Sequence, residues 1–401
     1  MSFRIVDFYS VRNLVFGMNA IEELGERAKQ YGRYALIITD KVLEKIGTVD
    51  KAVDSLKKAD VKVEIFDECE AEPRLEIYER AKDVARELKP EMIIGVGGGS
   101  NMDVSKVSAA LATNEGDAID YILPIPKEHE VEPRRLKARR LPLILVPTTS
   151  GTGSEVTRWA VVTVRGKKWD FKGNVQFLCD NAIVDPMLAS TMPPKLTVST
   201  GIDALSHAIE AVMSNSANFM SLPYSLKAIE LISKYLRRAY VDGDDLEARY
   251  YMSMAATYAG VALCNVGVVL AHAIAYTFAA QHKIPHGVSC GIALPYAMEY
   301  NLPLIQDKLA KIGEAMGVEG GGNQRSKAKL AIAAVYNLLK DLGMPTSLRE
   351  VGIGKNEIPS MIEDLLTVHT YLYPNNPRKV EEEPIRELYE RMWEGRILES
   401  S

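Results

Sequence analysis

The stretch EMIIGVGGGS, residues 91–100, decides the fold of this chain. Its apolar first part, Glu91–Val96, predicts a buried strand, and Met102–Ala112 follows with the spacing of a helix. Consecutive glycines between a strand and a helix let the backbone come close to an anion, and the N-terminus of the helix presents free N–H groups. The stretch therefore predicts a phosphate-binding loop at the end of a parallel strand, with a simple tight turn as the alternative.

The same alternation of strands and helices continues on both sides of this stretch. The further elements expected are the strands Tyr34–Thr39, Val61–Phe66 and Leu143–Pro147 and the helices Val49–Lys58 and Leu75–Leu88. Strands that are each separated by one helix form parallel sheets, and continuous apolar strands fit a sheet that is covered on both faces. The charged, proline-containing segment at residues 114–141 interrupts the alternation.

The pattern changes near residue 190, where the strand signals end and helical periodicity continues. The helices expected here are Ala204–Met213, Leu222–Tyr235, Asp245–Ala262, Val268–Ala280, Gly291–Glu299 and Ser326–Leu342. A chain of 401 residues is also longer than one ordinary core supports. We therefore predict an α/β domain at residues 1–190 and an all-helical domain at residues 191–401.

Composition and charge narrow the class of protein. The chain is 47% hydrophobic and 25% charged, with a net charge of -5, so its composition is globular and gives no basic surface for nucleic acid. The basic run from Arg134 to Arg140 is interpreted as a solvated loop. No stretch approaches the roughly 20 apolar residues of a membrane span, and the start lacks a signal-peptide pattern. The four cysteines are widely spaced, which favours reduced, mostly buried thiols and a cytoplasmic protein.

A second loop and one carboxylate extend the candidate anion site. The run PTTSGTGSE, residues 147–155, follows a predicted strand and is rich in hydroxyl groups and small residues. Ligands of open parallel sheets bind at the carboxyl ends of the strands, so two such loops indicate a dinucleotide. Asp40 closes the first of these strands, where it can accept a hydrogen bond from a ribose hydroxyl and repel a 2′-phosphate. A helix N-cap or turn aspartate is the alternative for Asp40, and a Ser/Thr-capped loop without a ligand is the alternative for the second loop.

Histidines are few, and some of them stand at spacings that suit a metal. Asp203 and His207 are four residues apart, which puts both side chains on one face of a helix. His272 lies in an apolar helical run, where a buried polar side chain needs a partner, and His286 follows in a break between two helices. One carboxylate and several imidazoles suit Fe²⁺ or Zn²⁺. A hydrogen-bonded core residue is the alternative for each histidine, because spacing alone does not bring these residues together.

Taken together, these motifs resemble the iron-containing (group III) alcohol dehydrogenases. The matching motifs are the GGGS loop at Gly97–Ser100 with Asp103 and Lys106, the PTTxGTGSE loop at Pro147–Glu155, the TGxDALxHAIE helix at Thr200–Glu210, and His272 followed by the PHG turn at Pro285–Gly287. Their order and spacing agree from about residue 10 to Asn376-Pro377-Arg378. The combination is far more specific than any single motif.

The resemblance implies an N-terminal Rossmann-like domain for the dinucleotide, a C-terminal all-helical metal-binding and catalytic domain, and an active-site cleft between them, the fold shared with dehydroquinate synthase. It implies a metal, Fe²⁺ or else Zn²⁺, bound by Asp203, His207, His272 and His286, and a cofactor, NAD or else NADP. The residues expected to bind the cofactor are Asp40, Gly97, Gly98, Gly99, Ser100, Asp103, Thr148, Thr149 and Thr152. Family members commonly assemble as homodimers or larger homo-oligomers.

Some positions depart from the family pattern. Tyr276 stands where many members have a second histidine that is assigned to proton relay. Tyr276 is therefore a candidate catalytic residue, although the unperturbed pKa of a phenol is about 10, and a packing residue is the alternative. Glu72-Pro73 replaces a frequent Asn-Pro, and the lysine that is common after the Thr-rich loop is either Lys168 or Lys172.

The expected function follows from these parts. A divalent cation can stabilise an alkoxide as a Lewis acid while hydride passes between the carbinol carbon and nicotinamide. We therefore predict a metal-dependent dehydrogenase that acts on a small primary alcohol or aldehyde, or on a ketone, with no nucleic-acid or membrane partner. The alternatives are a zinc glycerol dehydrogenase, a hydroxyacid–oxoacid transhydrogenase that keeps its cofactor bound, and a non-catalytic metal- and nucleotide-binding sensor.

Overall fold

The computed structural model describes residues 5–123, 133–171 and 173–397. The chain folds into two compact units, one formed by Tyr9–Met192 and the other by Pro193–Ser401 together with the residues up to Phe8. Of the described N-terminal residues, those up to Phe8 thus belong with the helices. One reason is aromatic packing, because the ring of Phe8 stacks on that of Tyr224 with centroids 6.1 Å apart.

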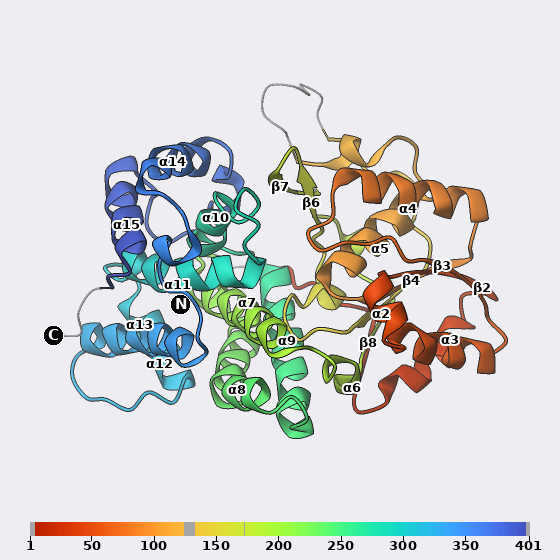
Figure 1. Cartoon of the computed structure of the whole chain (residues 1–401), viewed down its shortest axis with the longest axis horizontal. Helices are drawn as coiled ribbons and strands as arrows, with labels where there is room; N and C mark the ends of the chain where they lie inside the picture. Colours follow the sequence, from red (N-terminus) through yellow and green to blue (C-terminus); the bar gives the residue numbers. More distant parts are fainter. Residues whose placement is uncertain (1–4, 124–132, 172, 398–401) are drawn as a thin grey trace. The chain divides into compact units, whose positions relative to one another are not determined.

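A six-stranded sheet in the order β1-β8-β5-β4-β2-β3 forms the centre of the α/β unit, and every neighbouring pair is parallel (Figure 1). Its strands are β1 (Asn13–Phe16), β2 (Tyr34–Ile38), β3 (Lys62–Phe66), β4 (Met92–Gly97), β5 (Leu143–Pro147) and β8 (Asn181–Val184). The strands β2 to β5 confirm the parallel sheet predicted from the apolar runs. β1 and β8 were not anticipated, because each has only four residues and shows no clear period.

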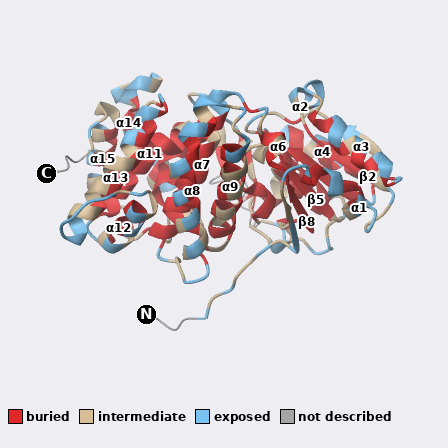
Figure 2. Cartoon of the chain, turned by 90° about the horizontal axis from the view of Figure 1, so that it is seen from below, coloured by how far each residue is buried: buried red, intermediate tan, exposed pale blue. Residues whose placement is uncertain are grey.

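Helices cover this sheet and bury its central strands completely, so that β5 and β8 are red in Figure 2 while the outer faces of α2 and α3 are exposed. The helices of this unit are α1 (Leu24–Ala28), α2 (Lys41–Lys45), α3 (Thr48–Lys58), α4 (Leu75–Leu88), α5 (Gly99–Leu111) and α6 (Pro186–Ala189). Ile37, Ile94 and Val146 from three neighbouring strands share one hydrophobic cluster with Leu24 and Leu56 from the helices. An antiparallel hairpin, β6 (Val161–Val164) with β7 (Lys167–Asp170), was not predicted.

The strand order reverses between β2 and β4. The chain passes from β2 outward to β3, and then returns to form β4 on the other side of β2, where Ile38 pairs with Gly95. In open parallel sheets, ligands bind outside the carboxyl ends of the strands at such a reversal. Asp40 and the Gly-rich loop follow these two strands directly, so the fold brings them to one edge.

The second unit is entirely helical in the part of the chain that the structure describes. Its helices are α7 (Pro194–Met213), α8 (Leu222–Val241), α9 (Leu246–Val266), α10 (Leu270–Tyr276), α11 (His286–Asn301), α12 (Gln306–Ala315), α13 (Gln324–Asp341), α14 (Ile358–Thr367) and α15 (Glu382–Glu394). From Ile202 to Met213, α7 is buried on every side, which is typical of a helix at the centre of a core. Two expectations need correction, since His286 begins α11 instead of lying between helices, and the helix of His272 ends at Tyr276 instead of Ala280.

Other expectations from composition have mixed outcomes. All four cysteines are buried and none of them forms a disulfide, as predicted. The predicted solvated loop is wrong for Arg140, whose side chain is 8% exposed and lies 2.6 Å from Asp180. Most of the prolines of the interrupting segment lie outside the described residues. Among the described helices, none is individually long and apolar enough to cross a membrane, although the bent pair of α9 and α10 passes that test by length and composition.

Candidate metal centre and dinucleotide loops

One face of α7 carries the polar side chains of the candidate metal centre. Asp203, His207 and Glu210 are spaced four and three residues apart, so they line one side of the helix. All three are buried, and Glu210 is fully inaccessible to solvent. Buried ionisable groups in an apolar helix are costly unless they are paired or bind a cation.

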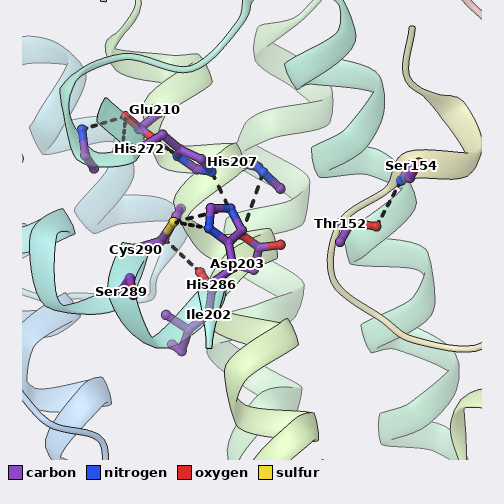
Figure 3. Close-up of polar contacts among 12 residues, drawn as sticks. Thr152, Ser154, Ile202, Asp203, His207, Glu210, His272, His286, Ser289 and Cys290 are labelled. Atoms are coloured by element: carbon purple, nitrogen blue, oxygen red, sulfur yellow. Dashed lines mark hydrogen bonds and ion pairs between the residues drawn. The ribbon is translucent and has the colours of Figure 1, made fainter. Parts of the chain in front are cut away.

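The predicted ligands meet in the helical unit (Figure 3). Asp203 Oδ1 lies 3.8 Å from His207 Nε2, 3.9 Å from His272 Nε2 and 3.5 Å from His286 Nε2. α7, α10 and α11 each contribute to this cluster. Donor atoms that bind one metal at about 2.1 Å in a tetrahedron lie about 3.4 Å from one another, so the observed spacing is close to that of a ligand set.

The cluster contains buried donor atoms without partners. Within the described residues, Asp203 Oδ1 and His272 Nε2 accept or donate no hydrogen bond. An unsatisfied buried polar atom costs about 1–3 kcal/mol, which a bound cation would remove. Burial also lowers the pKa of His207 and favours the neutral imidazole that metals bind. The residues present therefore fit a divalent metal ion.

Glu210 fixes the orientation of His272. Its Oε1 accepts hydrogen bonds from the backbone N–H groups of Val269 at 3.0 Å, Ala271 at 2.9 Å and His272 at 3.3 Å. Its Oε2 contacts His272 Nδ1, which leaves Nε2 facing Asp203. Sequence reasoning assigned no role to Glu210, although a carboxylate seven residues after Asp203 in an apolar helix is a readable signal.

Tyr276 ends α10 and packs beside the cluster instead of pointing to solvent. Its ring lies edge-on to His286, with centroids 5.8 Å apart, and edge-on to the buried His369, with centroids 5.6 Å apart. Cys290 lies one turn after His286 on α11, and its Sγ is 3.6 Å from His286 Nε2. Neither His369 nor Cys290 was singled out from the sequence as a neighbour of the candidate ligands.

In the α/β unit, the Gly-rich loop leads directly into α5. Gly97 has a φ of +151°, and a Cβ built there would lie 2.1 Å from Asn101 Nδ2, so only glycine fits. No side chain caps the N-terminus of α5, which leaves its first N–H groups available for an anion. The backbone N–H of Thr148 donates to the carbonyl of Gly97 at 3.0 Å, which joins the two predicted loops.

Asp103 and Lys106 hold the second loop in place. Asp103 accepts hydrogen bonds from Ser154 Oγ at 2.6 Å and from the backbone N–H of Val161 at 3.0 Å. Lys106 is fully buried and donates to Ser154 Oγ at 2.5 Å and to the carbonyl of Trp159 at 2.8 Å. The geometry gives this pair a structural role, and a direct cofactor contact by Asp103 stays a prediction.

Asp40 caps a helix, which was the alternative considered for it. Its Oδ1 accepts from the backbone N–H groups of Val42 at 2.9 Å and Leu43 at 3.1 Å, and its Oδ2 accepts from Asn101 Nδ2 at 2.8 Å. Capping fixes the carboxylate beside the Gly-rich loop and leaves a ribose contact as a prediction.

Two departures from the family pattern meet in the structure. Glu72 and Lys168 form an ion pair at 2.9 Å, and the backbone N–H of Glu72 donates to Ser100 Oγ at 3.2 Å. Lys168 is thus paired beside the Gly-rich loop, whereas Lys172 lies outside the described residues.

Comparison with known proteins assigns the family. Residues 12–186 match the family model of iron-containing alcohol dehydrogenase, and residues 197–393 match the C-terminal model of the Fe-containing alcohol dehydrogenase family. The chain is 37% identical to Long-chain-alcohol dehydrogenase 1 of Geobacillus thermodenitrificans and 36% identical to 1,3-propanediol dehydrogenase of Citrobacter freundii, each over 97% of this chain and 99% of the relative. A crystal structure of 1,3-propanediol oxidoreductase matches with a TM-score of 0.90 at 36% identity, over 97% of this chain and 100% of that chain.

The chain therefore belongs to the iron-containing alcohol dehydrogenase family. This finding confirms the predicted fold class and the predicted enzyme class, a metal- and nicotinamide-dependent alcohol dehydrogenase. The glycerol dehydrogenase alternative is not favoured.

Proposed function

We propose that this chain transfers hydride between a nicotinamide cofactor and a small primary alcohol or aldehyde, or a ketone, at a divalent metal held by Asp203, His207, His272 and His286. The observation that carries the proposal is the convergence of one carboxylate and three imidazoles, including buried donor atoms without partners, inside the helical unit. Fe²⁺ is the metal that we propose, and Zn²⁺ accepts the same ligands.

The metal, when bound, supplies a Lewis acid for the substrate oxygen, and the nicotinamide supplies or accepts the hydride. Asp203 is the only anionic member of the proposed ligand set, so the set cancels half of the charge of a divalent ion. Glu210 keeps the proton of His272 on Nδ1, which leaves Nε2 free to bind. The protein's contribution is therefore a fixed, mostly buried, partly neutralised set of donors.

Residues 1–190, which include nearly all of the α/β unit, are proposed as the dinucleotide-binding domain, and residues 191–401 as the metal-binding catalytic domain. Gly97, Gly98, Gly99 and Ser100 would offer backbone N–H groups to the pyrophosphate, with Thr148, Thr149 and Thr152 beside them. The position of Asp40 at the strand-order reversal supports NAD over NADP. Relatives are named both as an NAD-dependent methanol dehydrogenase and as an NADPH-dependent butanol dehydrogenase, so both cofactors need testing.

The cellular context is part of the same proposal. We propose a cytoplasmic homodimer or larger homo-oligomer that has small-molecule substrates and no nucleic-acid or membrane partner. The four buried cysteines form no disulfide, which is compatible with a reducing compartment. Sedimentation of the purified protein would measure the oligomeric state.

A substrate panel on metal-reconstituted protein tests the proposed activity. Protein freed of metal and reloaded with Fe²⁺ under anaerobic conditions is mixed with small alcohols, aldehydes and ketones, and NADH and NADPH absorbance is followed. We expect steady turnover that requires both the metal and free cofactor. Exchange between substrates without consumption of free cofactor would indicate the transhydrogenase, and no turnover by fully metal-loaded protein would indicate the non-catalytic sensor.

A further inference from the structure

A cysteine lies within the candidate metal cluster. Cys290 is fully buried on α11, and Figure 3 shows its sulfur directed toward the ring of His286. One donor atom each from Asp203, His272, His286 and Cys290 can be chosen so that all lie within 4.8 Å of one another. His207 is not part of this group of four.

Two separations within this group are close to those of a tetrahedral ligand set. A zinc ion binds sulfur at about 2.3 Å and nitrogen or oxygen at about 2.0–2.2 Å, which places a sulfur about 3.6 Å from a nitrogen and two lighter donors about 3.4 Å apart. The observed separations are 3.6 Å from Cys290 Sγ to His286 Nε2 and 3.5 Å from His286 Nε2 to Asp203 Oδ1. The sulfur is also 3.7 Å from His286 Nδ1, so it faces the imidazole ring, and a turn of that ring would aim Nε2 at an ion shared with Cys290.

We propose that Cys290 is a ligand of this centre when zinc or cobalt occupies it, in a set formed by Asp203, His272, His286 and Cys290. The inference rests on the proposed function, because it uses the same metal centre. Soft thiolates favour zinc over iron or manganese, so one protein has two overlapping donor sets. The set that contains His207 has one anionic ligand, the carboxylate of Asp203. The set that contains Cys290 has two, that carboxylate and the thiolate.

Coordination requires the loss of one proton. A cysteine thiol has an ordinary pKa of about 8.5, so the side chain has a proton to lose when a metal binds. A coordinating thiol is deprotonated by the ion's charge. The metal–sulfur bond then forms from the sulfur lone pair, the S–H proton passes to solvent, and neither partner changes its oxidation state.

Cobalt substitution tests the proposal with a spectrum instead of activity. Metal-free protein is loaded with Co²⁺ alone, bound cobalt is measured by elemental analysis, and the near-ultraviolet thiolate-to-cobalt charge-transfer band is recorded. We expect the band in the unmodified protein and in Cys264→Ser, a matched control that alters another fully buried cysteine of the same unit. Cys290→Ser should bind cobalt without the band, and His207→Ala should keep the band.

A competition measurement keeps the test decisive if Cys290→Ser folds poorly. In Cys290→Ala and in the unmodified protein, zinc and manganese affinities are compared. We expect the substitution to weaken zinc binding by at least roughly tenfold, since even partners outside the ligand set cost that much, and to change manganese binding by less than about threefold. Full cobalt occupancy without the band in the unmodified protein overturns the role of Cys290 and leaves the proposed metal centre intact. Absence of any divalent metal binding overturns both.

Discussion

In the α/β unit the motif side chains bond to one another, whereas in the helical unit the motif side chains include buried atoms that bond to nothing. Asp40 caps α2, and Asp103 holds the loop through Ser154. By contrast, Asp203 Oδ1 and His272 Nε2 have no hydrogen-bond partner in the described part of the chain. The first arrangement presents backbone N–H groups to a ligand from a preformed loop, and the second is complete only with a cation. Motif side chains that hydrogen-bond to the protein thus indicate a scaffold. A cluster with buried polar atoms that lack hydrogen-bond partners indicates a metal site.

The largest expected effect follows from removing a histidine of the cluster. His272→Ala or His286→Ala should remove most of the metal, about one ion per chain, and lower kcat/KM by roughly 10³-fold or more, because Lewis-acid stabilisation is lost. Elemental analysis and steady-state kinetics measure both effects. His282→Ala is the matched control, since His282 pairs with Glu357 outside the cluster. Full metal content in both cluster variants would show that the ligand assignment is wrong.

The sequence predicts the strands and loops of the α/β unit more completely than the side-chain cluster of the helical unit. Apolar strands and glycine runs are local signals, so the strands β2 to β5 and the Gly-rich loop could be placed within a residue or two. The convergence of Asp203 with His286 depends on how α7 packs against α11, which no local pattern contains. Cys290 cannot be identified for the same reason, since a polar residue in an apolar helix acquires a role only when its neighbours are known, whereas the spacing of Glu210 from Asp203 does contain a signal. β1 and β8 are too short to show a period.

A smaller effect is expected from Glu210→Gln. The amide oxygen of the new side chain can still accept hydrogen bonds from the backbone at the start of α10. Its NH₂ group cannot accept a hydrogen bond from Nδ1–H of His272, so the tautomer that leaves Nε2 free for the metal is disfavoured. Metal affinity should fall by roughly 10- to 100-fold, as it does when partners of ligating histidines are lost. Competition with a chelator measures it. Glu230→Gln, on the exposed side of α8, is the matched control. Unchanged metal affinity would show that Glu210 only caps the N-terminus of α10 and does not orient His272 for metal binding.

The α/β unit provides a test of charge with a still smaller expected effect. Asp40→Asn keeps an N-cap acceptor but removes the negative charge, so α2 should stay intact while repulsion of a 2′-phosphate is lost. We expect the ratio of kcat/KM with NADH to that with NADPH to fall by roughly tenfold, about 1.4 kcal/mol. Asp40→Gly, which also removes the cap, should relax the preference similarly. A wild-type preference for NADPH would show that other residues dominate the choice.

The smallest effect is expected at Tyr276, where the family pattern places a relay histidine. The ring packs edge-on between His286 and His369, and Tyr276→Phe preserves that ring and both contacts. A packing role therefore predicts that kcat changes by less than about threefold at any pH from mildly acidic to strongly alkaline. A relay role predicts a loss on the order of 10²-fold at neutral pH, because the hydroxyl would carry the proton. It further predicts that Tyr276→His stays active with an optimum at lower pH, since imidazole titrates near roughly 6.5. The pH profile of kcat for both variants separates the two roles. If the packing role holds, the proton must leave through water or a cofactor hydroxyl, and Tyr276 contributes shape beside the cluster instead of acid–base chemistry.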